Sequence, residues 1–145
     1  MNAYVLDASV APKWFLPQAG ESLVEESLEI LNDYAKGRTT LLVPDLFWPE
    51  LGNILWKAVR AGRMSRESAE EAVLAITSQK LPTSSSLPLL SDALGIAVSF
   101  QRTVYDAIYV ALAITSGRPL LTADEKLASA LAAHFPIRWL GSAAS

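Results

Sequence analysis

The sequence predicts an α/β fold in which a parallel β-sheet is covered by helices on both faces. Short, almost wholly apolar runs alternate along the chain with longer stretches of helical periodicity, which is the pattern of buried parallel strands joined by helical crossovers. At 145 residues the chain has the length of one domain. It has no internal repeat and no linker long enough to divide it. We therefore expect a single domain over residues 1–140 and a short tail over 141–145.

The first half of the chain has five segments of regular periodicity, with predicted strands at 4–6 and 41–43 and predicted helices at 21–36, 46–61 and 65–79. A short helical turn with Pro12 near its start follows the first strand. Ser22 and Glu25 have the spacing of a capping box at the start of the first long helix. Gly37 and Gly62 follow the first and second of these helices, as is typical of helix ends.

The second half repeats the alternation, with predicted helices at 89–100, 104–115 and 124–133 and predicted strands at 119–121 and 137–139. A short strand and a loop are predicted within 80–86. Three residues, 101–103, separate the first two helices, and Gly117 ends the second. The strand at 119–121 is apolar enough to be buried.

Composition limits the functional classes. Apolar residues make up 51% of the chain and charged residues 19%, which excludes intrinsic disorder and leaves apolar surface for a partner. Cysteine is absent, so disulfides, thiolate metal sites and a cysteine nucleophile are excluded. The formal net charge is -3, so nucleic-acid binding would need a local basic patch or a metal. Residues 1–20 lack a signal-peptide pattern, and no uncharged apolar run reaches about 18 residues. We expect a cytoplasmic protein without a membrane segment.

Four of the fifteen acidic residues stand at the ends of apolar segments, namely Asp7, Glu50, Asp106 and Asp124. No Lys or Arg lies within these segments, so we expect these carboxylates to lack a cationic partner. Because burying an uncompensated carboxylate costs several kcal/mol, such a placement needs a reason. In parallel sheets, functional residues gather beyond the carboxyl ends of the strands. Two strand ends and two helix starts could therefore bring the four acids together as a site for Mg²⁺ or Mn²⁺, which prefer oxygen ligands.

Helix capping and surface exposure are the alternative explanation for the same acids. Thr103 and Asp106 could form a cap pair, and Thr122 could cap a helix with Glu125, which leaves Asp124 in a first turn. The carboxylate at position 7 could accept hydrogen bonds from the turn after its strand. The one at position 50 could lie on an exposed helix edge.

Four blocks, "YVLDASV", "LFWPELGNIL", "TVYDAIYVALA" and "PLLTADEKL", resemble PIN domains in order and spacing, most closely the VapC-like toxins of bacterial toxin–antitoxin pairs. The resemblance runs from Tyr4 to about Trp139. It implies a three-layer α/β/α fold with a central parallel sheet and a ribonuclease that depends on Mg²⁺ or Mn²⁺. The acidic positions of the family carry over to Asp7, Glu50, Asp106 and Asp124, and its small hydroxyl positions to Ser9 and Thr122.

Hydrolysis of a phosphodiester with metal ions suggests a role for each of these residues. We expect Asp7 and Asp106 to be the principal metal ligands. Asp124 would bind a second ion or an outer water, and Glu50 would ligate through water or take a proton from the attacking water. The two hydroxyl residues would orient carboxylates or contact a phosphate oxygen, although simple helix capping explains them equally well.

Four cations, Lys13, Arg102, Arg118 and Lys126, are predicted near the active face, where they could bind RNA phosphates. Aromatic residues at 14–15, 47–48 and 56 exceed what short helices need. Core packing is one explanation for them. The family resemblance offers another, because such toxins bind a segment of a VapB-like antitoxin in a groove and usually form homodimers.

Other mechanisms lack their residues. Metal-free ribonucleases commonly use paired histidines, and the chain has only His134. A G-x-S-x-G elbow and glycine-rich phosphate loops are absent. Two other classes stay open: a non-catalytic PIN-like module that binds RNA or protein, which the four intact acids disfavour, and a receiver-like phospho-switch, which the helical middle of the chain disfavours.

Overall fold

The computed structural model describes residues 1–16 and 21–142, and in them the chain forms a five-stranded sheet of order β3-β2-β1-β4-β5. The strands are β1 (Asn2–Leu6), β2 (Thr39–Pro44), β3 (Thr83–Ser84), β4 (Leu120–Thr122) and β5 (Ile137–Trp139). Every neighbouring pair is parallel. All carboxyl ends therefore meet at one edge of the sheet.

The described residues also form six α-helices and three short 3₁₀ helices. The α-helices are α1 (Val24–Ala35), α2 (Phe47–Arg60), α3 (Arg66–Thr77), α4 (Leu90–Phe100), α5 (Val104–Ser116) and α6 (Glu125–Leu131). The 3₁₀ helices are η1 (Ala11–Trp14), η2 (Leu87–Leu89) and η3 (Leu140–Ser142). None of the helices in this part of the chain combines the length and the apolar character needed to cross a bilayer.

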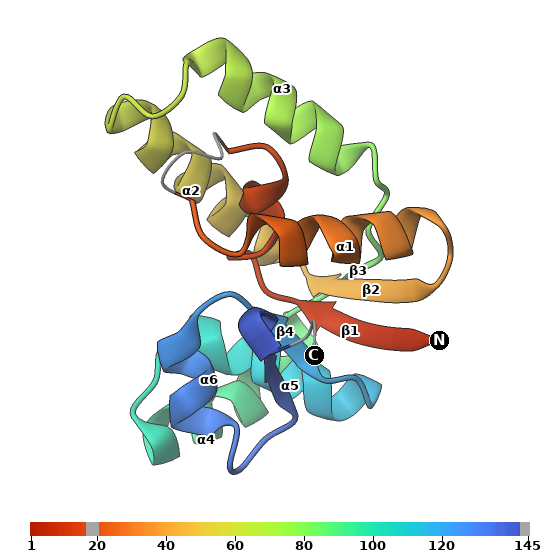
Figure 1. Cartoon of the computed structure of the whole chain (residues 1–145). Helices are drawn as coiled ribbons and strands as arrows, with labels where there is room; N and C mark the ends of the chain where they lie inside the picture. Colours follow the sequence, from red (N-terminus) through yellow and green to blue (C-terminus); the bar gives the residue numbers. More distant parts are fainter. Residues whose placement is uncertain (17–20, 143–145) are drawn as a thin grey trace.

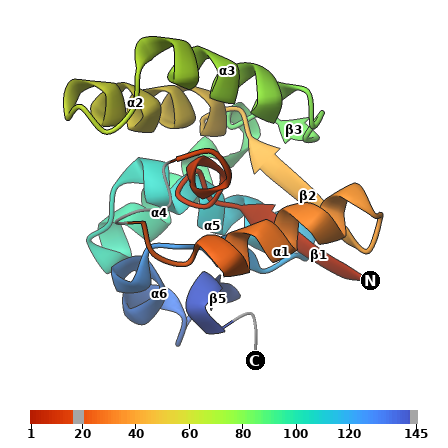
Figure 2. The same ribbon diagram turned by 45° about the horizontal axis from the view of Figure 1, so that its top comes forward.

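The connections make three layers. The chain builds β1, β2 and β3 in one direction, then returns past β1 to build β4 and β5 on the other side. Helices α1, α2 and α3 lie on one side of the sheet, and α4, α5 and α6 lie on the other (Figures 1 and 2), as right-handed crossovers require. The predicted three-layer α/β/α fold with a central parallel sheet is confirmed.

Helix α5 lies against the middle of the sheet, in contact with β1, β2 and β4. All of its residues from 107 to 113 are buried, which explains why this segment has no polar face. Its first turn reaches the edge where β1 and β4 end. The carboxyl-terminal edge and the start of α5 are thus held in one rigid unit.

Every predicted helix and strand forms, and most ends fall within two residues of the prediction. The exception is the start of α1, where the predicted capping box does not form. The residue before the helix is Leu23, whose φ of 60° is left-handed, and no side chain caps the helix. The reason is tertiary, because the carbonyl of Ser22 accepts a hydrogen bond from the buried Lys13 ammonium at 2.8 Å. The chain is therefore held in a non-helical path at Ser22.

The described part of the chain ends in a short helical turn. Leu140 is buried and begins a 3₁₀ turn that extends to Ser142. Residues 143–145 of the predicted tail, like 17–20, lie outside the described residues. A single domain with a short tail stays a prediction.

Candidate functional site

The carboxyl ends of β1 and β4 form the centre of the candidate site. These two strands are neighbours, with Leu6 paired to Leu121. The order of strand addition switches sides between them, because β2 and β3 lie beyond β1 and β5 lies beyond β4. The backbone N–H of Asp7 still donates to the carbonyl of Leu121 at 3.0 Å, so Asp7 is the first residue beyond β1. Ligands of open parallel sheets bind at such switch points.

Asp7 is buried, with only 9% of its surface exposed. The hydroxyls of Ser9 and Thr122 both donate to its Oδ2, the latter at 3.0 Å. These hydroxyls also accept from backbone N–H groups after β4: that of Ala123 donates to Ser9 and that of Asp124 to Thr122, each at 3.0 Å. Ser9 and Thr122 thus fix the carboxylate between the two strand ends. Burial raises the pKa of Asp7, the two hydroxyl bonds lower it, and the charge of Asp106 raises it further.

Glu50 comes from the first turn of α2 and is held by a residue that the sequence reasoning missed. The hydroxyl of Tyr109, on α5, donates to Glu50 Oε1 at 2.7 Å. Burial raises the pKa of Glu50, the bond from Tyr109 lowers it, and the charges of Asp7 and Asp106 raise it. Tyr109 itself is only 1% exposed, and burial together with the charges of Asp7 and Glu50 raises its pKa, so it stays a proton donor. The signal was its spacing, because a residue three positions after Asp106 lies on the same helix face.

Asp106 has a cationic partner, which corrects the expectation drawn from its own segment. The guanidinium of Arg102, in the turn before α5, lies 3.1 Å from Asp106 Oδ2, and both side chains are partly exposed. The cap pair predicted as an alternative also forms, since the Asp106 N–H donates to the Thr103 hydroxyl at 3.1 Å. That cap uses the backbone of Asp106. Its carboxylate is left for Arg102 and the acids nearby.

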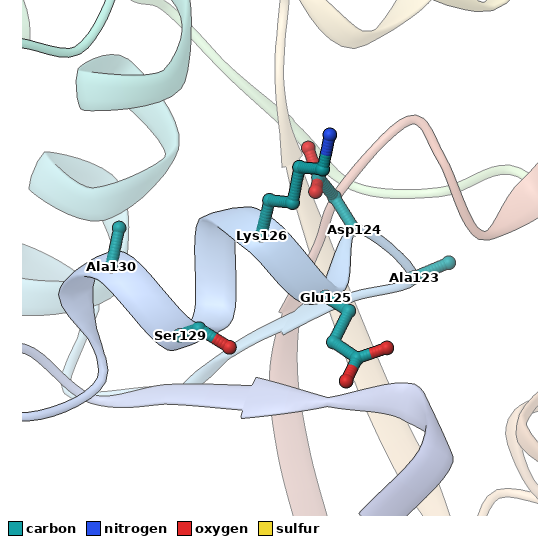
Figure 3. A pocket seen from close by; sticks show the side chains of 6 residues that line it. All are labelled: Ala123, Asp124, Glu125, Lys126, Ser129 and Ala130. Atoms are coloured by element: carbon teal, nitrogen blue, oxygen red, sulfur yellow. The ribbon is translucent and has the colours of Figure 1, made fainter.

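Asp124 is exposed and serves as the cap of α6, its Oδ1 accepting from the Leu127 N–H at 3.1 Å. The predicted cap by Thr122 and Glu125 is therefore wrong, because Thr122 is engaged by Asp7. In Figure 3 the Asp124 carboxylate and the Lys126 ammonium lie on one side of α6, and Glu125 points to the other. The charge of Asp106 acts on both Asp7 and Glu50, whereas Asp124 is not among the causes that shift the pKa of either. The structure thus brings the charges of three of the four acids within range of one another and uses Asp124 as a helix cap.

Asp7, Glu50 and Asp106 suit a hard divalent cation by their chemistry. All three offer carboxylate oxygens, the ligands that Mg²⁺ and Mn²⁺ prefer. Within residues 1–16 and 21–142, Asp7 and Glu50 have no ion pair with Lys or Arg. As the side chains stand in that part of the chain, no three acidic or histidine residues are close enough together to hold a metal ion. A bound ion would therefore need these side chains to draw together, which the repulsion between their like charges opposes in its absence.

Two of the four predicted phosphate-binding cations, Lys13 and Arg118, are engaged with other side chains. Lys13 is buried, and its ammonium lies 2.6 Å from Glu21. Arg118 precedes β4 and contacts Thr40, which pairs with Ala3 near the start of β1. It therefore belongs to the amino-terminal edge, about 13 Å from Asp7 at 3.3 Å per strand residue. Placing Arg118 on the active face was therefore wrong, whereas a role for Lys13 in RNA binding stays a prediction, with its ammonium already paired to Glu21.

The other two predicted cations, Arg102 and Lys126, do flank the acids. Arg102 is held by its ion pair with Asp106. Lys126 is exposed beside Asp124 and, among the described residues, has no ion pair. Lys126 is therefore the one of the four that can reach a phosphate without first giving up a partner.

Comparisons with known proteins agree with this geometry. The PIN domain family model matches residues 4–131. The chain is 33% identical over 126 residues to "Ribonuclease VapC3" of Pyrobaculum aerophilum, which covers 86% of this chain and 91% of that protein. A crystal structure of PAE2754 from the same organism superposes with a TM-score of 0.68 at 26% identity, covering 89% of this chain and 79% of that one. The structure of VapBC2 from Rickettsia felis, bound to a DNA fragment from its promoter, superposes with a TM-score of 0.62. The match covers 94% of this chain and 98% of that one, and at 13% identity it shows likeness of fold.

Proposed function

The chain belongs to the PIN-domain family, in its VapC branch, and from that membership we propose that it is an endoribonuclease that uses Mg²⁺ or Mn²⁺ and acts as the toxin of a toxin–antitoxin pair. The observation that carries the proposal is the group of acids near the carboxyl ends of β1 and β4, where the order of strand addition switches sides. Burial is the main cause that raises the pKa of Asp7 and of Glu50, and among the described residues neither has an ion pair with Lys or Arg. A divalent ion is the partner that such a group calls for.

The roles of the residues follow from their contacts. When bound, the metal would neutralise charge on the phosphoryl group and make water a stronger nucleophile. Asp7, Asp106 and Glu50 would hold it, and Ser9, Thr122 and Tyr109 would fix the directions of Asp7 and Glu50. Asp124 has Oδ1 committed to the α6 cap, so we assign it to a second ion or an outer water. Lys126, and Arg102 after release from Asp106, would bind RNA phosphates.

A cleavage assay tests the proposal directly. Purified protein would be incubated with end-labelled and with circular RNA in Mg²⁺, Mn²⁺ or EDTA. We expect cleavage of both RNAs with metal and of neither in EDTA, because only an endonuclease opens a circle. Asp7→Asn and Asp106→Asn should each retain less than about a tenth of the activity, given the several kcal/mol that metal catalysis supplies.

The alternatives have their own outcomes in that assay. RNA bound without cleavage by the wild type at any metal concentration would favour a non-catalytic PIN-like module. Transfer of a labelled phosphoryl group to the protein would favour a receiver-like switch. Expression of the wild type in bacteria should arrest growth, whereas expression of Asp106→Asn should not. Equal arrest by both would separate toxicity from nuclease chemistry.

The proposed antitoxin would bind between α2 and α3. A hollow of about 350 Å³ lies there, lined by apolar side chains that include Leu55, Trp56 and Val73. Trp56 is 53% exposed although it is large and aromatic. Of the other aromatic residues that the sequence singled out, Trp14 and Phe47 are buried in the core, and Phe15 and Trp48 pack against it. We propose that a VapB-like segment covers Trp56, in line with the paired toxin and antitoxin of VapBC2.

A second apolar surface supports a homodimer. Exposed large side chains gather on α4, α5 and the turn before α4, namely Leu87, Leu90, Leu94, Val98 and Ile114. Exposed apolar patches of this kind mark protein interfaces, and we propose that a second copy covers this one. We place the protein in the cytoplasm, where RNA is available to it.

A further inference from the structure

A hollow beside the acidic group has no part in the roles assigned above. It has a volume of about 300 Å³ and lies where the start of α2 meets the first turn of α5. Its walls are formed by Leu46, Pro49, Glu50, Asn53 and Tyr105. Because Glu50 forms part of the wall, whatever occupies the hollow lies next to the reacting group.

Tyr105 is exposed in the first turn of α5, just before the stretch of the helix that is buried. Its side chain is 60% exposed, whereas Tyr109, one turn further along, is 1% exposed. In the part of the chain that the structure describes, the Tyr105 hydroxyl makes no hydrogen bond, in contrast to that of Tyr109. An aromatic face at the mouth of a nuclease site is a platform on which a nucleobase can stack.

The charges in the hollow favour a base over a phosphate. Glu50 contributes a carboxylate, and no Lys or Arg is among the lining residues. The nearby carboxylates of Asp7 and Asp106, which act on Glu50, would repel a phosphate in the same way. A neutral base meets no such repulsion, and its amino and imino groups can donate to oxygen acceptors.

Asn53 supplies the group that could distinguish one base from another. It is exposed, and its amide has no hydrogen bond among the described residues. A side-chain amide offers both donors and an acceptor, which is the pattern needed to recognise the edge of a base. Only an unpaired base can present its Watson–Crick edge to such a group.

We propose that this hollow binds an unpaired nucleobase next to the scissile phosphodiester, stacked on Tyr105 and hydrogen-bonded by Asn53. The inference rests on the proposed ribonuclease function and adds to it a preference for single-stranded RNA and a base preference at one position. Tyr105 and Asn53 are in this view specificity residues, distinct from the acids that perform the chemistry.

The test measures binding and cleavage separately. Short single-stranded RNAs that carry 2-aminopurine at successive positions would be titrated with protein in EDTA, where no cleavage is expected. Stacking on Tyr105 should quench the fluorescence at one position. Tyr105→Ala should abolish that quenching and weaken binding about tenfold, as expected for loss of one stacked base, whereas Tyr105→Phe should stay within about twofold of the wild type.

The matched control is Leu74→Ala, which removes another exposed large apolar side chain, on α3 and away from the acids. It should leave RNA binding unchanged. Cleavage of a randomised RNA pool with metal should show Tyr105→Ala raising KM with little change in kcat. Asn53→Ala should relax the base preference at one position. The affinity for duplex RNA should be unaffected by any of these three substitutions.

The outcomes separate this inference from the proposed function. Cleavage by the wild type, with the same KM and the same sites for Tyr105→Ala, would overturn the base site and leave the nuclease standing. Quenching at one position that depends on Tyr105, without cleavage by the wild type in any metal, would support the base site and overturn the nuclease. Unchanged RNA binding by Tyr105→Ala with weakened binding of a VapB-like peptide would assign the hollow to a protein partner and overturn the inference. Melting curves would confirm that each variant is folded.

Discussion

Replacing Asp7 with asparagine should stabilise the metal-free protein, although most substitutions at buried positions destabilise. The change removes one negative charge and keeps the size and shape of the side chain. Asp7 is 9% exposed, and no Lys or Arg pairs with it among the described residues. Its only compensation there comes from hydrogen bonds such as those of Ser9 and Thr122. Burying this charge therefore destabilises the metal-free fold, and under the proposed function a bound metal would compensate for it.

The sign follows from the direction of the pKa shift. Burial, the largest cause, raises the pKa of Asp7 above its ordinary value of 3.8, so just above pH 3.8 the folded state binds more protons than the unfolded state. The stability of the wild type should then fall as the pH rises from 3.8 through the folded pKa. The difference between wild type and Asp7→Asn should be largest at neutral pH and should shrink in acid.

The magnitude comes from two opposing effects. Burying a carboxylate costs several kcal/mol, and two charge-assisted hydrogen bonds return about 1 kcal/mol each beyond what neutral ones supply. The expected net gain for Asp7→Asn is about 1–2 kcal/mol. For a domain of this size that corresponds to a rise in Tm of about 3–6 °C.

Thermal melts of both proteins in EDTA and in Mn²⁺, at pH 5 and pH 8, would measure these effects. The wild type should gain about 2.7 kcal/mol when Mn²⁺ is a hundredfold above its Kd, and Asp7→Asn should gain much less. Asp33→Asn is the control, because Asp33 lies on the surface 3.7 Å from Arg38 and such pairs contribute little. A lower Tm for Asp7→Asn at pH 8 in EDTA, with no response of the wild type to Mn²⁺, would refute the reasoning.

Three further predictions concern other parts of the molecule. Tyr109→Phe removes the hydroxyl bond that lowers the pKa of Glu50. We therefore expect about tenfold slower cleavage and an acidic limb of the pH–rate profile that moves to higher pH. An unchanged profile would show that the bond does not matter for the reaction. Gly141→Ala would place a Cβ 2.4 Å from the Trp139 ring, so urea denaturation should show that the free energy of unfolding falls by about 1–3 kcal/mol. An unaltered midpoint would contradict the packing at this turn. Leu94→Glu puts a charge on the exposed apolar face of α4. Sedimentation should then show dimers of the wild type and monomers of the variant. Dimers that persist in the variant would place the interface elsewhere.

Much of the fold was predictable because it depends on local periodicity. The fully apolar stretch that becomes the buried part of α5 and the short apolar runs that become β1 and β4 each indicated their own element. The start of α1 was not predictable in this way. Its local signal, the spacing of Ser22 and Glu25, was overruled by the contact from Lys13, a residue of another element.

The same distinction, between local signals and contacts of distant segments, applies to the site. Asp7, Glu50 and Asp106 could be found from the sequence because a charged residue at the end of an apolar segment is visible without coordinates. Tyr109 was not visible as a partner, because it reaches Glu50 across 59 positions. Thr122 was named from the family resemblance, but only the structure shows that it binds Asp7, 115 positions away. Arg102 was expected near the active face, but its pairing with Asp106 was missed, because that contact depends on the turn between α4 and α5.

The sequence by itself determined the order of the elements, the apolar core and the identity of the acidic residues, since each is encoded within a few neighbouring positions. Only the tertiary structure decided which side chains share the site. The order of the strands placed Asp7 beside Thr122, left Asp124 as a helix cap, and moved Arg118 to the opposite edge of the sheet. Contacts between distant segments depend on how strands and helices pack, and no local pattern of residues carries that information.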